Sequence, residues 1–457
     1  MSTSSTGSRF FRDSVIALLI LVGLEGLVRV GGWADGPDPA IPDNAVVEVG
    51  AGEGPYLEDA PQPGFLQTAR EEVRAGRMLD LTFSKVPATG TLRVVLLGGS
   101  VAKGVPVDSD PARTIAGRLS FHLEAHGLEV EVLNLAGASY TTAHVARVAR
   151  EVVQAQPDAV VVYSGGNEYR AFTRRLWEQN QGWRGAVRVS QGLHLIRMLG
   201  RLAAVLRGDE RPGQPSDGMH EVIAGQSQLV SEVMSRLLAD AGAEGLPEWT
   251  EAGTPIRRDP AAEAVVSAYR ASLNTVVEAA DAMSTPAKLL LVKPPANHFT
   301  PPQLSLHSPE MSEAQAVAFE EHFAVGAAAQ RRGDCRAAVA SFEAALAIDT
   351  LHADVWHQHG KCLLDLGDPA GTARRNLEIA LELDFAPDRA GRSLHAVVDD
   401  LVMEPNVYTV DLSPEFGPDS DFGRAVFHDH VHLKASGQDR VARRVADTLV
   451  PLLRSRL

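Results

Sequence analysis

Five short apolar runs, separated by stretches with helical periodicity, constrain the fold of this chain more than any other feature. Each run predicts a strand, and the uninterrupted apolar run at residues 94–97 predicts a strand that is buried on both faces. The predicted strands are residues 92–97, 130–135, 159–163, 289–292 and 407–412, and the predicted helices are near residues 114–126, 141–154, 261–283 and 435–453. Strands that alternate with helices predict an α/β domain with a parallel sheet covered on both faces.

The first predicted strand leads directly into a candidate nucleophile. Its apolar residues are followed by Gly98 and Gly99, which permit a tight turn, and then by Ser100. A serine at the carboxyl end of a parallel strand lies where open α/β sheets bind their ligands. The same stretch is also typical of a plain turn that binds phosphate or nothing, so this fragment alone leaves both interpretations open.

A second stretch, near the carboxyl terminus, offers a carboxylate and a base. In Asp429-His-Val-His432 an imidazole follows a carboxylate by three residues. Acyl transfer by a serine nucleophile needs such a base and a group that orients it. Three histidines crowd this stretch, His428, His430 and His432, and they leave two alternatives open: a metal site and a polar loop before the last helix.

Two further fragments follow predicted strands. Gly137 lies in the segment 134–139 after the second strand, and Asn167 lies in the segment 163–168 after the third. We expect the Gly137 N–H and the Asn167 side-chain amide at the same sheet edge as Ser100, where they could donate hydrogen bonds to an oxyanion. Taken singly, each fragment is typical of an ordinary turn.

In this order the four fragments resemble the SGNH/GDSL hydrolase superfamily. That family carries a Gly-x-Ser block, a Gly block, a Gly-x-Asn block and a terminal Asp-x-x-His block, which correspond here to residues 98–100, 137, 165–167 and 429–432. The resemblance covers about residues 90–170, 285–300 and 405–457. It implies a flavodoxin-like three-layer α/β/α sandwich. One departure is Gly99, which stands where the family commonly has Asp.

The resemblance also implies a role for each site residue. Ser100 is the expected nucleophile, His432 the general base and then acid, and Asp429 the group that orients His432. The N–H groups of Ser100 and Gly137 and the amide of Asn167 form the expected oxyanion hole. No metal and no organic cofactor is implied. The implied activity is hydrolysis of an ester through an acyl-enzyme on Ser100, with an envelope glycan or lipid as the expected substrate.

Two other functions remain open at this stage. An O-acyltransferase would use the same triad and pass the acyl group to a hydroxyl group instead of water. An adaptor would bind a peptide through the helical repeats described below, while its hydrolase site would be vestigial. The four fragments together favour an enzyme over the adaptor.

An apolar segment near the amino terminus predicts attachment to a membrane. Residues 15–24 are apolar without interruption, the pattern continues to Trp33, and Arg9 and Arg12 precede it. We expect a single-pass signal-anchor over residues 1–33 of a bacterial membrane protein, with the catalytic domain outside the cytoplasm. A cleaved secretory peptide and a buried amphipathic helix are the alternatives. Residues 34–88, which hold many Pro, Gly and acidic residues, predict a linker.

Two insertions interrupt the α/β pattern. Arginines alternate with apolar residues in the first part of residues 170–258, which predicts a helical insertion that covers the domain or meets an anionic partner. Residues 313–400 resemble tetratricopeptide repeats, because Gly333-Asp334 recurs at Gly367-Asp368 and segment 342–349 recurs at 377–384. We expect this region to separate two parts of the hydrolase domain, residues 89–312 and 401–457. It either shapes the rim of the active site or binds a protein partner.

Charge and cysteine content narrow the partners further. The formal net charge of −15 disfavours nucleic acid, whose phosphates such a protein repels. Cys335 and Cys362 lie in one helical region and imply no disulfide framework. The expected partners are therefore an ester substrate, the membrane and a protein bound by the repeats.

Overall fold

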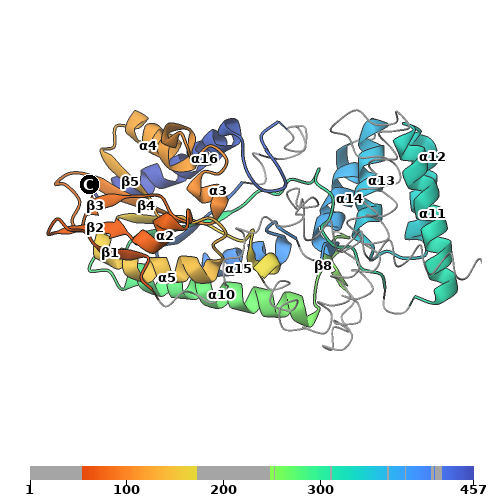
Figure 1. Cartoon of the computed structure of the whole chain (residues 1–457), viewed down its shortest axis with the longest axis horizontal. Coiled ribbons are helices and arrows are strands. Elements are labelled where there is room, and N and C mark those ends of the chain that lie inside the picture. The colour runs from red at the N-terminus through yellow and green to blue at the C-terminus, as the bar shows by residue number, and fades with distance from the viewer. Residues whose placement is uncertain are drawn as a thin grey trace, which may run out of the picture. The chain divides into compact units, whose positions relative to one another are not determined.

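A five-stranded parallel sheet organises the structure, a computed structural model that describes residues 54–171, 247–251, 253–308, 311–367, 370–385, 387–412, 416 and 425–457. The strands are β4 (Leu92–Gly98), β5 (Val130–Asn134), β6 (Ala159–Tyr163), β9 (Lys288–Lys293) and β10 (Val407–Asp411). Their order is β10-β9-β6-β4-β5, and every neighbouring pair is parallel. The prediction of an α/β fold with a parallel sheet is confirmed, and each predicted strand is present (Figure 1).

The strand order places a crevice beside β4. The chain passes from β4 to β5 on one side, and its next strand, β6, pairs with the other side of β4. The connections that leave the neighbouring strands β4 and β6 therefore run toward opposite edges of the sheet, and doubly wound sheets bind ligands at the carboxyl ends of such a pair. Ser100 directly follows β4, and Ser164 directly follows β6.

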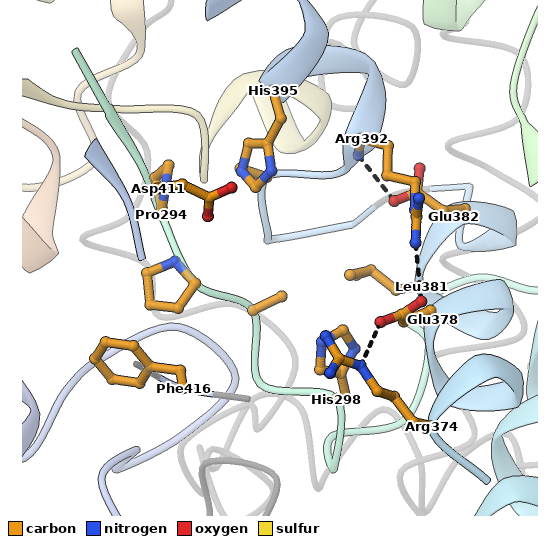
Figure 2. A pocket seen from close by; sticks show the side chains of 13 residues that line it. Pro294, His298, Arg374, Glu378, Leu381, Glu382, Arg392, His395, Asp411 and Phe416 are labelled. Atoms are coloured by element: carbon orange, nitrogen blue, oxygen red, sulfur yellow. Dashed lines mark hydrogen bonds and ion pairs between the residues drawn. The ribbon is translucent and has the colours of Figure 1, made fainter. Parts of the chain in front are cut away.

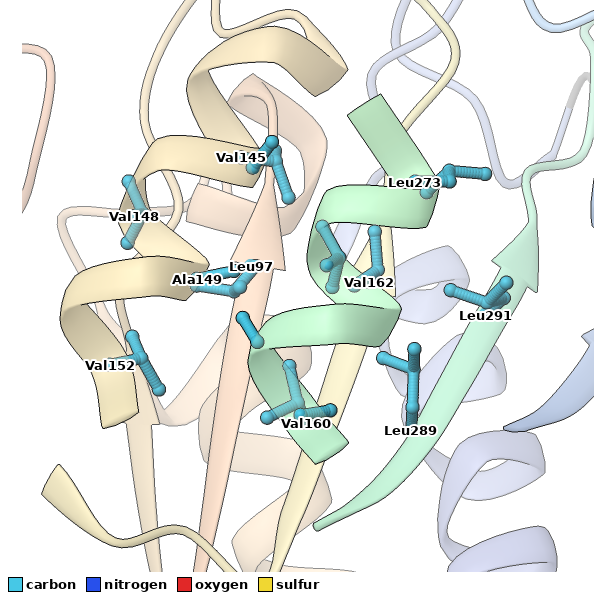
Figure 3. Packing of buried hydrophobic residues seen from close by; sticks show 14 of the residues in the cluster. Leu97, Val145, Val148, Ala149, Val152, Val160, Val162, Leu273, Leu289 and Leu291 are labelled. Atoms are coloured by element: carbon cyan, nitrogen blue, oxygen red, sulfur yellow. The ribbon is translucent and has the colours of Figure 1, made fainter. Parts of the chain in front are cut away.

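Alternate residues of each strand pack against helices on opposite faces of the sheet. Leu97, Val160 and Leu289 belong to one buried cluster, which includes residues of α5 (Thr142–Val152), α10 (Pro260–Asp281) and α15 (Arg392–Leu401) (Figure 3). Val94, Leu96 and Leu290 belong to the other, with residues of α4 (Ile115–Ala125) and α16 (Ala435–Arg454). The central strands β4, β6 and β9 are mainly apolar because both of their faces are buried, whereas the edge strands β5 and β10 are partly exposed and contain polar residues.

Residues 54–84 correct the prediction of a linker over residues 34–88. They form a three-stranded antiparallel sheet of β1 (Leu57–Asp59), β2 (Phe65–Thr68) and β3 (Thr82–Ser84), with helix α2 (Arg70–Arg74) between β2 and β3. Tyr56, Leu66 and Phe83 are buried in the same cluster as α5 and α10. Glu151 of α5 also accepts hydrogen bonds from the N–H groups of Tyr56 and Leu57. The prediction failed because the many Pro and Gly residues concealed a few well-spaced apolar ones.

Four helices precede the last part of the domain. They are α11 (Glu313–Arg331), α12 (Cys335–Leu346), α13 (Ala353–Asp365) and α14 (Ala370–Leu383), and each contacts the next along the chain. Phe319, Phe342 and Val355 lie in a hydrophobic cluster that belongs to these helices. Gly326 permits close packing, because a Cβ there would lie 2.7 Å from the Phe342 ring. After α15 the chain returns to the main sheet, where β10 pairs with β9.

Buried polar groups join the four helices to the segment that follows β9. Asp384 is fully buried and accepts hydrogen bonds from the N–H groups of Gln303 and Leu304 and from Arg389. Asp349, whose side chain is also fully buried, lies 2.9 Å from His307 Nδ1. A short hairpin of β7 (Glu248–Trp249) and β8 (Pro255–Ile256) contacts α14.

The remaining predictions concern segments that are only partly described. The predicted anchor, residues 1–33, and most of the predicted insertion 170–258 lie outside the described residues. Among the helices that the structure does describe, none combines the length and the apolar character needed to cross a bilayer. The described residues all belong to one compact unit, Glu48–Arg174 with Ser235–Leu457.

The His307–Asp349 pair predicts a pH-dependent stability. Burial lowers the pKa of His307, but hydrogen bonds to Asp349 and Glu320 outweigh it and raise the pKa from 6.5 to about 9. Charged His307 therefore stabilises the folded state fully below pH 6.5, and this contribution is lost as the pH rises through about 9. We expect His307→Gln to lower the melting temperature by an amount that shrinks from pH 6 to pH 9.5, measured by thermal unfolding. A constant difference across that range would contradict the assignment.

Candidate active site

A tight turn after β4 presents Ser100. Gly98 has φ of 154°, and a Cβ there would lie 2.1 Å from the Tyr163 carbonyl oxygen of β6. A Cβ on Gly99 would lie 3.0 Å from the Asn167 side-chain nitrogen. Position 98 therefore requires glycine, whereas a side chain at position 99 would only need a small shift of the Asn167 amide. Helix α3 (Ser100–Lys103) begins at the serine itself, so the Ser100 N–H lies in the first helical turn, where no carbonyl of the helix can accept it.

A short loop before α16 presents the base. Phe427 pairs with Leu433 in an isolated antiparallel bridge, and the His428 N–H donates to the His432 carbonyl at 2.8 Å. Inside this loop, Asp429 Oδ1 accepts hydrogen bonds from the N–H groups of Val431 at 2.9 Å and His432 at 2.7 Å. The loop therefore fixes the carboxylate and the imidazole relative to each other.

The structure brings Ser100, His432 and Asp429 together in one hydrogen-bonded chain. His432 Nδ1 lies 2.8 Å from Asp429 Oδ2, and His432 Nε2 lies 2.8 Å from Ser100 Oγ. An ionised carboxylate can only accept, so the Nδ1 atom carries the proton. The Nε2 atom is then free to accept the Ser100 hydroxyl proton, which is the arrangement that activates a serine nucleophile.

Asp429 stays ionised because its hydrogen bonds outweigh its burial. Burial of the side chain raises its pKa, whereas the hydrogen bond with the His432 ring and the N–H groups of Val431 and His432 lower it. The net effect holds the pKa of Asp429 well below its usual range. A permanently charged Asp429 can stabilise the imidazolium that forms when His432 takes a proton.

Asn167 lies at the carboxyl end of β6, where a buried carboxylate positions it. Glu168 Oε2 accepts the Asn167 N–H at 2.9 Å, while its Oε1 accepts the N–H and the hydroxyl of Thr142 at 2.9 and 2.6 Å. Burial raises the pKa of Glu168. The Asn167 side-chain amide donates one hydrogen to the Tyr140 carbonyl at 3.0 Å, which leaves its second hydrogen for another acceptor.

The structure places Gly137 differently from the prediction. Its N–H donates to the Gly98 carbonyl at 3.0 Å and is therefore engaged within the protein. Two residues further on, Ser139 adopts φ of 61°, and within the described part of the chain its N–H has no acceptor. A glycine was expected to present the open N–H, whereas in the structure a serine adopts the left-handed conformation.

One group that fixes the triad loop could not be recognised from the sequence. The Asn297 side-chain amide, in the segment after β9, donates to the Asp429 carbonyl at 2.7 Å. Arg389, which precedes α15, donates in turn to the Asn297 carbonyl at 2.7 Å and to the Thr300 carbonyl at 3.1 Å. These bonds involve backbone carbonyls, which carry no sequence signature.

A second supporting group comes from the amino-terminal sheet region. Glu72 of α2 accepts a hydrogen bond from the Tyr140 hydroxyl at 2.5 Å and pairs with Arg77. The Arg77 carbonyl accepts the Ala138 N–H at 2.9 Å. Residues of the corrected linker thus hold the loop that contains Ser139, and Tyr140 of the same loop supplies the acceptor for the Asn167 amide.

The metal-site alternative for the three histidines finds no support in the described residues, where no cluster of His, Cys, Asp and Glu side chains is suited to hold a metal ion. His430 lies 3.4 Å from Asp388, and His432 belongs to the triad. Around the serine the surface forms a depression of about 30 Å³. Its lining includes Ser100, Tyr140, Asn167, Pro294, Pro295, Ala390 and Val431.

Fold and site together define an α/β protein with a Ser–His–Asp triad at the carboxyl edge of a parallel sheet. Comparison with protein-family models gave no match, and comparison with curated proteins gave none either. Among solved structures, a lipase/acylhydrolase from Enterococcus faecalis is similar at 12% identity and a TM-score of 0.27, covering 79% of this chain and 96% of that one.

Two other solved structures are similar at the same level. TesA shares 12% identity at a TM-score of 0.30, covering 79% of this chain and 99% of that one. The lipase Lip_vut3 from a goat rumen metagenome shares 11% identity at a TM-score of 0.31, covering 78% of this chain and 96% of that one. Similarity at these scores does not establish the activity of this chain, for which the geometry of the site is the evidence.

Loss of the Asn297 amide should slow the reaction. Asn297→Ala removes the hydrogen bond to the Asp429 carbonyl and frees the triad loop, and small misplacements of catalytic groups cost roughly 10- to 100-fold in rate. We expect kcat on a short-chain ester to fall by about that factor with little change in KM. Asn376→Ala, which removes a buried asparagine of α14 bonded to His359, is the matched control and should leave kcat unchanged. Equal effects of both variants would show that Asn297 is merely structural.

Proposed function

We propose that this protein is a serine esterase of the SGNH/GDSL type, which cleaves an ester through an acyl-enzyme on Ser100. The single observation that carries the proposal is the hydrogen-bonded chain from Asp429 Oδ2 through both ring nitrogens of His432 to Ser100 Oγ. This alignment of residues far apart in the sequence disfavours the adaptor hypothesis, in which the hydrolase site is vestigial and its geometry would not need to be kept. The tight turn before Ser100, which requires glycine at position 98, supports the same conclusion.

The geometry supports a two-step reaction. The Ser100 oxygen attacks the ester carbonyl carbon while its proton passes to His432 Nε2. The tetrahedral intermediate collapses when that proton passes to the leaving alcohol oxygen, and the acyl group stays on Ser100. A water molecule then attacks the acyl carbon and gives its proton to His432, which returns a proton to the Ser100 oxygen as the carboxylic acid leaves. A hydroxyl group in place of water would make the protein an O-acyltransferase.

Three donors are available to the oxyanion. They are the N–H of Ser100, the second amide hydrogen of Asn167 and the N–H of Ser139, which we propose in place of that of Gly137. The Ser100 N–H lies in the first turn of α3. The Asn167 side-chain amide donates one hydrogen to the Tyr140 carbonyl, and the Asn167 backbone N–H donates to Glu168. Donors fixed before the reaction stabilise the developing negative charge without a cost of reorganisation.

We also propose a repeat architecture for the inserted helices and a membrane anchor for the amino-terminal segment. The four helices α11–α14, with the recurring Gly-Asp turns at residues 333 and 367, support two units of the tetratricopeptide type. Residues 1–33 supply a single-pass anchor to a bacterial membrane, with the esterase domain on the outside. The apolar run 15–24 behind Arg9 and Arg12 supports this location.

Loss of any triad member should abolish most of the activity. We expect Ser100→Ala and His432→Ala to lower kcat on para-nitrophenyl acetate by roughly 10⁴-fold or more, because the nucleophile or its base is removed. Asp429→Asn should cost about as much, since the amide no longer holds the imidazole with its proton on Nδ1. Circular dichroism checks that the variants fold. Full activity in Ser100→Ala would overturn the proposal.

Loss of a donor to the oxyanion should lower kcat less than loss of a triad member. Asn167→Ala should lower kcat by roughly 10²-fold, because one donor to the transition state is lost. The KM value should change much less, since the ground-state carbonyl carries little charge. A kcat equal to that of the wild type would exclude Asn167 from the oxyanion site and leave the triad assignment intact.

A further inference from the structure

A second and larger cavity lies beside the serine. Its volume is about 260 Å³, and it shares Pro294, Pro295 and Ala390 with the depression around Ser100. A group that fills it would therefore be attached to, or lie next to, the ester at the nucleophile. Figure 2 shows side chains that surround this cavity.

The walls of this cavity come from two parts of the chain. Pro294, His298 and Asp411 follow or end strands of the main sheet, whereas Glu382 belongs to α14 and His395 to α15. Helix α14 is the last of the four inserted helices, and it also contributes Arg374, Glu378 and Leu381. The inserted region thus builds part of the surface next to the active site.

The two arginines that line the cavity are already paired. Glu378 accepts hydrogen bonds from both lining guanidinium groups, from Arg374 at 2.7 Å and from Arg392 at 2.8 Å (Figure 2). Glu382 accepts the Arg392 N–H at 2.8 Å. Burial raises the pKa of Glu382 to about 7, so this carboxyl is partly protonated near neutral pH. An anionic ligand would compete with Glu378 for its arginines, which argues for a neutral occupant.

Two neutral imidazoles face the cavity from different elements. Burial lowers the pKa of both His298 and His395 to about 4, so neither ring carries a charge at neutral pH. One nitrogen of each ring, His298 Nδ1 and His395 Nε2, is buried without a hydrogen-bond partner in the described residues. A neutral imidazole both donates and accepts hydrogen bonds, as hydroxyl groups do.

Apolar surface complements these polar groups. Pro294, Pro295, Leu381 and Phe416 line the cavity together with the histidines and carboxyls. An alkyl chain would satisfy the apolar part only and would leave buried polar groups without water, which is costly. A ring that carries hydroxyl groups on its edge and C–H groups on its faces matches both kinds of wall.

We propose that this cavity binds the alcohol part of the ester as a hydroxyl-rich, sugar-like ring, with His298, His395 and Glu382 as its hydrogen-bonding residues. This inference rests on the proposed esterase function and specifies the substrate class of the same site. Because α14 lines the cavity, the inserted helices would then help to select the substrate.

A pair of esters with the same acyl group tests the inference. The substrates are an O-acetylated methyl glucoside and para-nitrophenyl acetate, and the readout is the ratio of their kcat/KM values. We expect His395→Leu and Glu382→Leu each to lower this ratio by about 10-fold or more, mainly through a higher KM for the sugar ester. Glu382→Gln, which keeps hydrogen-bonding atoms and shape, should retain most of the ratio. His322→Leu, an exposed histidine of α11, is the matched control and should leave it unchanged.

The possible outcomes separate the two proposals. Absence of hydrolysis of both esters by the wild-type protein would overturn the esterase function and the inference with it. Hydrolysis of para-nitrophenyl acetate together with an unchanged ratio in both Leu variants would overturn the inference alone. A preference for para-nitrophenyl octanoate that the Leu variants strengthen would assign the cavity to an alkyl chain and also overturn it. Thermal unfolding of each variant ensures that the comparison is made on folded protein.

Discussion

The hydrogen bond between His432 Nε2 and Ser100 Oγ joins the two ends of the α/β domain. Ser100 follows β4, the first strand of the main sheet, and His432 lies in the loop just before the last helix, α16. The strands of the main sheet must be arranged so that these two atoms lie 2.8 Å apart. The parallel sheet meets this requirement, because the carboxyl ends of its strands all lie at one edge.

Neighbouring regions hold the two halves of the site in place. Glu72 and Arg77 of the amino-terminal region bind the loop that contains Ser139 and Tyr140. On the other side, Asn297 binds the Asp429 carbonyl, and Arg389 binds Asn297. Asp384, at the end of α14, pairs with Arg389 and so connects the inserted helices to the triad loop. The insertion is therefore connected to the triad loop by a short series of hydrogen bonds, and its helix α14 lines the cavity beside the serine.

The sequence predicted the parts of this structure that depend on local pattern. The strands were recognisable because their residues are mainly apolar, and Ser100, Asp429 and His432 because their order and spacing are restrictive. Asn297 and Glu72 were not recognisable, since their partners are a carbonyl oxygen and a tyrosine hydroxyl far away in the sequence. The predicted linker failed at residues 54–84, where a few buried side chains outweigh a composition rich in Pro and Gly.

Gly137 illustrates a second limit of prediction from sequence. The sequence indicates where a backbone can adopt unusual angles, but it does not indicate which N–H remains free after folding. The Gly137 N–H donates to the Gly98 carbonyl, while the N–H without an acceptor among the described residues belongs to Ser139, a residue type that seldom adopts positive φ. Only the three-dimensional arrangement of the loop distinguishes them.

The most direct test of this account is a crystal structure of the protein after reaction with a fluorophosphonate, whose bound form mimics the tetrahedral intermediate. We expect the phosphorus atom to be bonded to Ser100 Oγ. The unsubstituted oxygen on phosphorus should lie within hydrogen-bonding distance of the Ser100 N–H and the Asn167 side-chain nitrogen. Phosphorus on another residue, or an oxygen directed away from both donors, would contradict it.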